Sequence, residues 1–318
     1  MERLTAGVLL FVCCVVAHGA YPERPVRLIV PAAPGGAIDV VGRLVGGRLA
    51  DVLGQNVVID NRAGANNIIG SEIAARSVPD GYTLLTTAGA HTINPAVYRK
   101  LPYDALRDFT PISHMCNSGG LVIAVHPSFP ARTLQELIDQ AKANPAKVNY
   151  GSAGFGNLTH VAGEMFKVMA GVRITHVPYK AAGPAINDLL AGHIPLMFGP
   201  SPVLVPMVQQ GRLRALAYTG TARSPQLPNV PTVEESGIKG YVASGWYGLY
   251  GPRGLPEPIV NTLASAVQRV VHTPEMKERL AGLNLEAVGS TPAEFAAFLK
   301  EDLQRYARIA KAAGIEPQ

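Results

Sequence analysis

Two glycine-rich turns contain the residue types that can bind a small anion through main-chain atoms. The first turn spans residues 31–39 and the second spans residues 151–160, and each follows a short apolar run typical of a β-strand. Neither turn contains a lysine or an arginine. Where a strand leads through glycines into a helix, the first N–H groups of the helix lack partners and lie at its positive end. Each turn is therefore a candidate anion seat made of backbone amides.

The two turns lie about 120 residues apart, which predicts two lobes that hold one small anionic ligand between them. In open α/β sheets, ligands bind at the carboxyl ends of the strands. Four loops fit this position, at residues 32–39, 87–94, 152–160 and 179–184. Their small or neutral side chains can hydrogen-bond a carboxylate from several directions: Thr87, His91, Thr92, Asn94, Ser152, Asn157, Thr159 and His160. The alternative is that these are ordinary turn and helix-capping residues.

Three further side chains near these loops each have two interpretations. Asp39 follows Gly35 and Gly36 closely, so it fits the first helical turn, where a carboxylate caps free amides and complements the helix dipole. It could instead bind an ammonium group of a ligand, but we favour the structural role. Trp246 and Tyr247 could form a wall of the ligand cleft or belong to the core, and both interpretations remain open.

Metal binding and catalysis receive little support from the residue pattern. We assign neither His91 nor His160 a histidine or glutamate partner at metal-ligand spacing, and Cys116 stands alone, so we expect no metal and no cofactor. Ser152 does not lie in a Gly-x-Ser-x-Gly elbow, and no complete Walker or dinucleotide glycine pattern is present. A receptor without catalytic residues is therefore favoured. A hydrolase or lyase that uses Ser152 and His160 in the same cleft remains the alternative.

The composition is that of a folded globular chain with a mild positive charge. Of the 318 residues, 47% are hydrophobic and 16% are charged, with a formal net charge of +5. A positive excess favours anionic ligands through the overall field. Lysine and arginine are scattered singly, without a basic run or a basic-aromatic stripe. We therefore expect no nucleic-acid partner.

Residues 1–20 have the pattern of a secretory signal peptide. Arg3 precedes an uncharged apolar stretch of about 12 residues, which is shorter than the roughly 20 residues that span a bilayer. Small residues then place the cleavage site after Gly19 or Ala20. An uncleaved anchor is the alternative.

The cysteines agree with export of a chain that depends on its core for stability. Cleavage would remove Cys13 and Cys14 and leave Cys116 as the one remaining cysteine, so the mature chain can form no internal disulfide. About 300 residues are enough to bury a large apolar core without such bonds. We therefore expect a periplasmic protein.

Strands and helices alternate along most of the chain. Strands at residues 26–30, 56–60 and 82–87 flank a helix that ends at Gly54 and a second helix at 69–76. This β-α-β-α-β order with short connections is typical of a doubly wound α/β sheet. A similar run begins near residue 121 and continues to residue 219. A strand at 241–250 and two C-terminal helical segments follow it.

The second α/β run predicts a discontinuous division of the chain. We expect a first lobe formed by residues 21–122 plus 230–318 and a second lobe formed by residues 123–229. Two crossover strands, near residues 121–126 and 230–240, would form the hinge. The ligand cleft would then lie between the lobes.

The order of short motifs along the mature chain resembles the Bug family, the substrate-binding proteins of tripartite tricarboxylate transporters. The motifs include Arg27-Leu28-Ile29-Val30-Pro31, Asp60-Asn61-Arg62, Pro79-Asp80-Gly81-Tyr82, Ile93-Asn94-Pro95, Leu101-Pro102-Tyr103-Asp104, Val177-Pro178-Tyr179-Lys180 and Pro228-Asn229-Val230-Pro231-Thr232. The resemblance implies a type 2 periplasmic binding fold that closes on a small carboxylate. It also implies a monomer that serves inner-membrane transporter subunits, with a membrane sensor kinase as an alternative partner.

The resemblance assigns ligand-binding positions in three loops. They are Ala33, Gly35, Gly36 and Asp39 in the first loop, Thr87, Ala88, Gly89 and Asn94 in the next, and Ser152, Gly154, Asn157 and His160 in the last. Two segments depart from the family pattern. Pro195 and Gly199 stand where members often have aspartate, which disfavours an amino acid as ligand. Residues 63–67 replace the usual Pro-Gly-Ala-Gly-Gly-Asn run, so this loop could shape a different pocket wall.

Overall fold

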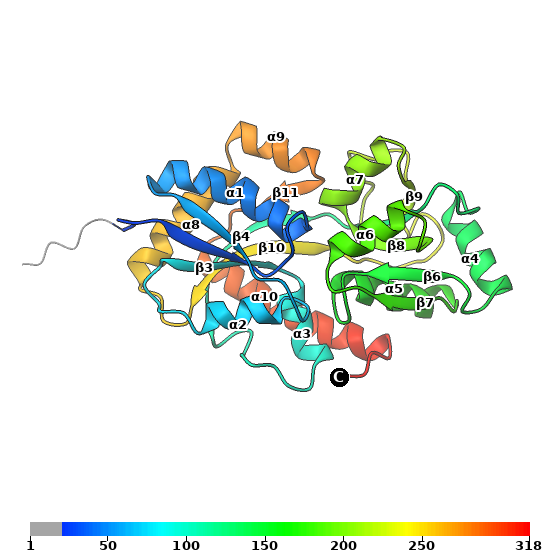
Figure 1. Ribbon diagram of the computed structural model, residues 1–318, viewed down its shortest axis with the longest axis horizontal. Coiled ribbons are helices and arrows are strands. Elements are labelled where there is room, and N and C mark those ends of the chain that lie inside the picture. Colours follow the sequence, from blue (N-terminus) through cyan, green and yellow to red (C-terminus); the bar gives the residue numbers. More distant parts are fainter. Residues whose placement is uncertain (1–20) are drawn as a thin grey trace, which may run out of the picture.

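The computed structural model describes residues 21–318 and has two lobes, each built on its own β-sheet (Figure 1). The six strands of the first-lobe sheet lie in the order β11 (Leu285–Ala287), β4 (Phe109–Ser118), β10 (Gly245–Pro252), β3 (Thr83–Ala88), β1 (Val26–Val30) and β2 (Val57–Asn61). The five strands of the second-lobe sheet lie in the order β7 (Thr175–Pro178), β6 (Asn149–Ser152), β8 (Leu196–Pro200), β5 (Leu121–Val125) and β9 (Arg214–Tyr218). The predicted two-lobed α/β fold is confirmed.

Helices cover both faces of the first-lobe sheet. Strand β1 pairs in parallel with β2 and β3, and β10 runs antiparallel between β3 and β4. Val26, Leu28 and Val30 pack with α1 (Ala37–Leu53), α8 (Glu257–Val271) and α9 (Pro274–Gly282). Ile29 points to the other face, which α2 (Ile68–Ala75) and α10 (Pro292–Ala312) cover. The alternation explains why an uninterrupted apolar run forms this strand: both of its faces are buried.

The second lobe repeats this arrangement with its own helices. Strand β6 pairs in parallel with β7 and β8, and β5 runs antiparallel between β8 and β9. Leu121, Ile123 and Val125 pack on the face of α4 (Leu134–Ala143) and α5 (Leu158–Ala170). Val122 and Ala124 face α6 (Ala182–Leu190) and α7 (Ser201–Gln209). The lobe therefore has a core on each face of its sheet.

The chain crosses between the lobes twice, at residues 119–120 and along residues 219–244. The two crossings pass backbone to backbone. A Cβ on Gly220 would lie 2.3 Å from the Gly119 carbonyl oxygen, and one on Gly120 would lie 2.5 Å from the Gly220 nitrogen. Only glycine fits such an approach.

Two details of the predicted organisation are wrong. Residues 230–240 are mostly turns rather than a strand, with one isolated bridge from Thr232 to Tyr218. Residues 87–94 are not all loop, because helix α3 (Ala90–Val97) begins at Ala90 and includes Pro95. A proline disfavours a helical residue before it, which explains why this helix is hard to predict. The lobe boundaries stay a prediction.

The predicted signal peptide, residues 1–20, lies outside the described residues. Within residues 21–318, none of the helices has the length and apolarity that a membrane crossing needs.

Candidate functional site

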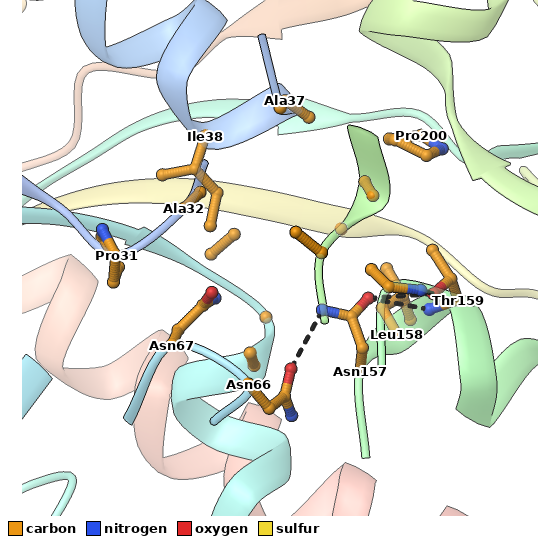
Figure 2. Close-up of a pocket in the computed structure, with 18 of the residues that line it drawn as sticks. Pro31, Ala32, Ala37, Ile38, Asn66, Asn67, Asn157, Leu158, Thr159 and Pro200 are labelled. Atoms are coloured by element: carbon orange, nitrogen blue, oxygen red, sulfur yellow. Dashed lines mark hydrogen bonds between the residues drawn. The ribbon is translucent and has the colours of Figure 1, made fainter. Parts of the chain in front are cut away.

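A cleft between the two lobes encloses about 860 Å³ of space, part of it open to solvent (Figure 2). The first lobe contributes residues from the β1–α1 loop, the loop before α2 and the start of α3. The second lobe contributes the starts of α5, α6 and α7. The strand ends next to the crossings add Ser118 of β4, Leu121 of β5 and the stretch Gly245, Trp246 and Tyr247 of β10. The lining therefore comes from both lobes and from the strand ends beside the two crossings.

The N-cap residues of six helices line this cleft. They are Gly36 (α1), Asn67 (α2), Gly89 (α3), Asn157 (α5), Ala181 (α6) and Pro200 (α7). Of these, only the Asn157 side chain caps its own helix. Helices α4, α9 and α10, whose starts lie outside the cleft, instead have threonine caps. The positive ends of six helices thus point at the cleft. At five of them the N-cap side chain accepts no hydrogen bond from the free amides of the helix.

The first glycine turn holds its shape through Asp39, which is buried behind it. The Asp39 carboxylate accepts hydrogen bonds from Gly35 N–H (2.9 Å), Asn61 Nδ2 (2.8 Å) and Arg43 Nε (3.0 Å). Burial raises the pKa of Asp39, but the bonds from Arg43, Asn61 and Gly35 outweigh it and hold the pKa below its ordinary value. Asp39 does not line the cleft. This geometry fits the structural role rather than contact with a ligand ammonium.

The free amides of the first turn belong to the residues after the glycines. Gly35 N–H donates to Asp39, and Gly36 N–H donates to the Ala33 carbonyl at 3.1 Å. Ala37 and Ile38 occupy the first two helical positions of α1 and line the cleft. Within residues 21–318 their N–H groups have no acceptor, as expected for a helix start. The free backbone donors of this turn are therefore those of Ala37 and Ile38 rather than those of the glycines.

The second glycine turn satisfies most of its own amides. Ala153 N–H donates to Thr159 Oγ1 at 2.9 Å, and Gly154 N–H donates to Ser152 Oγ at 3.1 Å. Gly156 N–H donates to His160 Nδ1 at 3.2 Å. Among the described residues, Leu158 at the first position of α5 keeps a free amide beside the cleft. The second turn therefore offers fewer free donors than its glycine content predicts.

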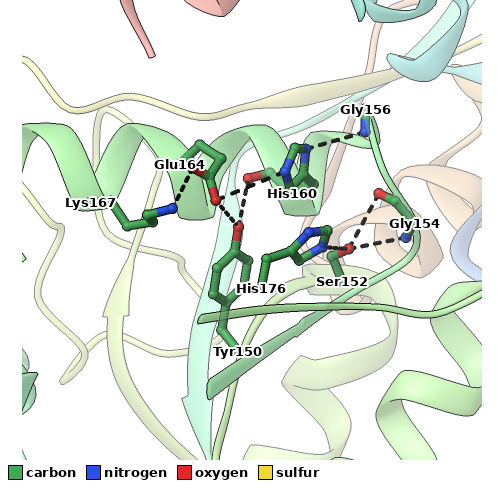
Figure 3. Close-up of polar contacts among 8 residues, drawn as sticks. All are labelled: Tyr150, Ser152, Gly154, Gly156, His160, Glu164, Lys167 and His176. Carbon is green, nitrogen blue, oxygen red and sulfur yellow. Dashed lines mark hydrogen bonds and ion pairs between the residues drawn. The ribbon is translucent and has the colours of Figure 1, made fainter. Parts of the chain in front are cut away.

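A buried polar cluster supports the second turn from behind (Figure 3). Ser152 Oγ lies 2.6 Å from His176 Nε2, so the hydrogen-bond partner of Ser152 in this cluster is His176 rather than His160. The rings of His160 and His176 lie 4.2 Å apart, and Glu164, one helical turn after His160, lies 3.9 Å from its Nε2. This i, i+4 pair is visible in the sequence and was missed there.

Both imidazoles of this cluster are neutral near pH 7. Burial is the main cause that lowers the pKa of His160 and His176 to about 4 each, and their mutual proximity lowers that of His176 further. His160 Nδ1 accepts the Gly156 amide, so its proton lies on Nε2, toward Glu164. Glu164 is in turn bound by Lys167 and by the Tyr150 hydroxyl, each at 2.7 Å. Through Ser152 and the Gly156 amide, the two histidines connect this cluster to the second turn.

The predicted site residues separate into two groups. Those that line the cleft are Ala33, Gly36, Ala88, Gly89 and Asn157. Those that do not line it are Gly35, Asp39, Thr87, Asn94, Ser152, Gly154 and His160. Most of the second group stabilises the loops that carry the first. Asn94, for example, accepts a bond from Asn66 Nδ2 at 2.7 Å and donates to the Asn66 carbonyl at 3.0 Å.

The assignment of site residues missed several that line the cleft. Lys180 is the one charged side chain among its described lining residues, and no ion pair involves it within residues 21–318. Asn66 and Asn67 lie in the loop that departs from the family pattern. Trp246 lines the cleft and is also buried, with its Nε1 donating to Asp302 at 2.8 Å, so both of its interpretations hold.

The cleft is suited to an anion and lacks the groups that bind metals. Its lining combines helix N-termini, three asparagines and one lysine with alanine, glycine and larger apolar side chains, and contains no aspartate or glutamate. In the described part of the chain, no three His, Cys, Asp or Glu residues are grouped so that they could hold a metal ion.

Comparison with known proteins agrees with this geometry. Residues 41–315 match the family model described as Tripartite tricarboxylate transporter family receptor. Protein BugT of Bordetella pertussis is 34% identical over 321 residues, covering 99% of this chain and 98% of its own.

Two solved structures of Rhodopseudomonas palustris proteins are also similar. One, named as containing adipate, has a TM-score of 0.91 at 34% identity and covers 94% of this chain and 100% of its own. The other, MatC with bound malate, has a TM-score of 0.86 at 30% identity and covers 91% and 99%. The chain therefore belongs to the Bug family of tripartite tricarboxylate transporter receptors.

Proposed function

We propose that this protein is a monomeric periplasmic receptor that captures a small carboxylate between its lobes and delivers it to inner-membrane transporter subunits. The observation that carries the carboxylate assignment is the convergence of six helix N-caps on one cleft without an acidic lining side chain. The relatives named with adipate and malate support the same ligand class.

The two lobes contribute differently to the bound acid. A carboxylate oxygen accepts hydrogen bonds from the free amides of Ala37 and Ile38 at the start of α1. The second lobe adds the amide of Leu158 and the positive ends of α5 and α6. The predicted residues behind the lining, such as Asp39 and Ser152, act by fixing these loops.

Closure of the lobes is the mechanism by which binding becomes a signal to the transporter. Asn157 Nδ2 donates across the cleft to Asn66 Oδ1 at 3.1 Å, and an apolar cluster joins α3 and α10 to α5 beside it. An acid that contacts both lobes stabilises this arrangement by its difference in affinity for the closed and open forms. The transporter subunits then distinguish the loaded receptor by its closed shape.

Calorimetric titration of the purified protein against succinate, glutarate, adipate, malate, citrate and benzoate tests the receptor function. Before titration the protein is unfolded and refolded, which removes any acid carried over from the host. We expect at least one acid to bind and, at 100 times its dissociation constant, to stabilise the fold by about 2.7 kcal/mol. No binding by any acid would contradict the proposal.

The fate of the bound acid distinguishes a receptor from a hydrolase or lyase. A receptor releases its ligand unchanged, so mass spectrometry after prolonged incubation should recover only the acid that was added. A new product that requires Ser152 or His176 would instead favour the enzyme.

In vivo crosslinking from the periplasmic protein tests the identity of its membrane partner. It should capture integral transporter subunits, whereas capture of a sensor kinase would support the alternative partner.

A further inference from the structure

The loop before α2 holds three consecutive non-glycine residues in the left-handed backbone region. The φ angles are +45° at Ala65, +50° at Asn66 and +71° at Asn67. This conformation costs an L-residue about 1–2 kcal/mol, although asparagine tolerates it better than most residues. Such strain persists where the surrounding structure requires it, and it concentrates at functional sites. The loop therefore has a reason to place these side chains where they are.

The strained backbone brings two carboxamides to the cleft with different surroundings (Figure 2). Asn66 is buried and fully bonded: it donates to Asn94 and accepts from Asn157 of the second lobe. Asn67 forms no side-chain hydrogen bond within residues 21–318, and its Nδ2 is buried without a partner. A buried donor without an acceptor is destabilising until something accepts from it. At Asn67 that acceptor has to come from the cleft.

The charges around Asn67 determine which kind of acceptor fits. The cleft lining has no aspartate or glutamate. The Asp39 carboxylate, which does not line the cleft, already accepts hydrogen bonds from Gly35, Arg43 and Asn61. An ammonium group would face Lys180 and the positive ends of six helices without an anionic partner. A carboxylate oxygen, in contrast, fits both the helix ends and the Asn67 donor.

On the basis of the proposed receptor function, we propose that Asn67 contacts the ligand, donating from Nδ2 to an oxygen of a bound acid that carries no ammonium group. Asn66 stabilises the loop through Asn94 and connects the two lobes through Asn157, whereas Asn67 hydrogen-bonds the ligand. The ligand class is then a carboxylic acid with an uncharged, mainly apolar body, because alanine, proline, isoleucine and leucine side chains form much of the remaining wall.

Pairs of acids that differ only by an amino group test whether the cleft excludes a ligand with an ammonium group. Calorimetric titration of the refolded protein compares succinate with aspartate, and glutarate with glutamate. We expect the acid without the amino group to bind at least tenfold more tightly in each pair. Equal or tighter binding of aspartate or glutamate would overturn the exclusion. Failure of every acid to bind would instead remove the receptor function on which the inference rests.

Two variants test the Asn67 contact. Asn67→Gly removes the donor and suits the positive φ, so the fold should be retained, with a loss of at least tenfold in affinity for the preferred acid. Asn67→Asp keeps the shape but places a negative charge beside the ligand, so its loss should be larger. Ala146→Gly, an exposed position with a φ of +61° outside the cleft, is the control for relief of strain and should bind like the parent. Parental affinity in Asn67→Gly would overturn the contact while leaving the receptor function intact.

Discussion

Replacing Gly156 by alanine should weaken ligand binding because it obstructs contact between the lobes. Gly156 has a φ of +72°, and an added Cβ would lie 2.4 Å from Val97 Cγ2 and 3.3 Å from Asn66 Nδ2. Gly156 belongs to the second lobe, whereas both neighbours belong to the first. The steric conflict therefore arises only when the lobes are in contact, and it acts against the closed form.

The magnitude has two separable parts. The left-handed backbone costs alanine about 1–2 kcal/mol in either form, so it lowers overall stability. Overpacking against Val97 costs about 1–3 kcal/mol in the closed form alone. Since each 1.4 kcal/mol corresponds to a factor of ten, affinity for the acid should fall by roughly 5- to 150-fold.

Gly171→Ala is the matched control for this prediction. Gly171 has a φ of +63° at the end of α5, and an added Cβ would meet nothing within 4 Å. Both variants should lose similar thermal stability without ligand, but only Gly156→Ala should lose affinity by calorimetry. Val97→Ala combined with Gly156→Ala should recover much of the loss, because it removes the atom in conflict. Equal affinities of the two single variants would refute the role of this contact in closure.

Three further outcomes follow from the charges and hydrogen bonds of the site. His160 and His176 have a pKa lowered to about 4, so the unfolded chain binds protons that the folded chain does not. Stability should therefore be fully present above about pH 6.5 and fall toward pH 4. The slope should reach up to about 1.4 kcal/mol per pH unit for His160 and be smaller for His176, which solvent screens more. Denaturant unfolding between pH 7 and 4.5 measures this, and a flat profile would contradict it. Asp39→Asn removes the charge that three donors share and should destabilise the fold by about 1–3 kcal/mol, with reduced acid affinity; parental melting and binding would count against its structural role. Lys180→Gln removes the positive charge of this lining side chain, so acid affinity should fall severalfold and depend less on ionic strength. Titration at low and high salt measures both effects. An unchanged salt dependence would show that Lys180 does not contribute to the electrostatics of the cleft.

The fold was predictable because its signals are local. The apolar run of β1, the glycine turns and the end of α1 at Gly54 each depend on residues close together in the chain. The convergence of helix starts on one cleft also follows from where the loops lie in α/β sheets.

The distribution of free amides was not predictable from the glycines. The N–H groups of Gly35 and Gly154 are not free because the side chains of Asp39 and Ser152 accept hydrogen bonds from them. These bonds can be identified only from the three-dimensional structure. Asn67 was missed as a site residue for a similar reason. Its importance arises from a backbone held at positive φ and from the lack of a nearby partner, and neither property has a sequence signature.

A crystal structure of the protein with its preferred acid tests the central claim most directly. We expect a carboxylate oxygen within about 2.7–3.2 Å of the N–H groups of Ala37 and Ile38, at the uncapped start of α1. An acid bound in the cleft by Lys180 alone, with these amides facing elsewhere, would contradict an anion site built from helix N-termini.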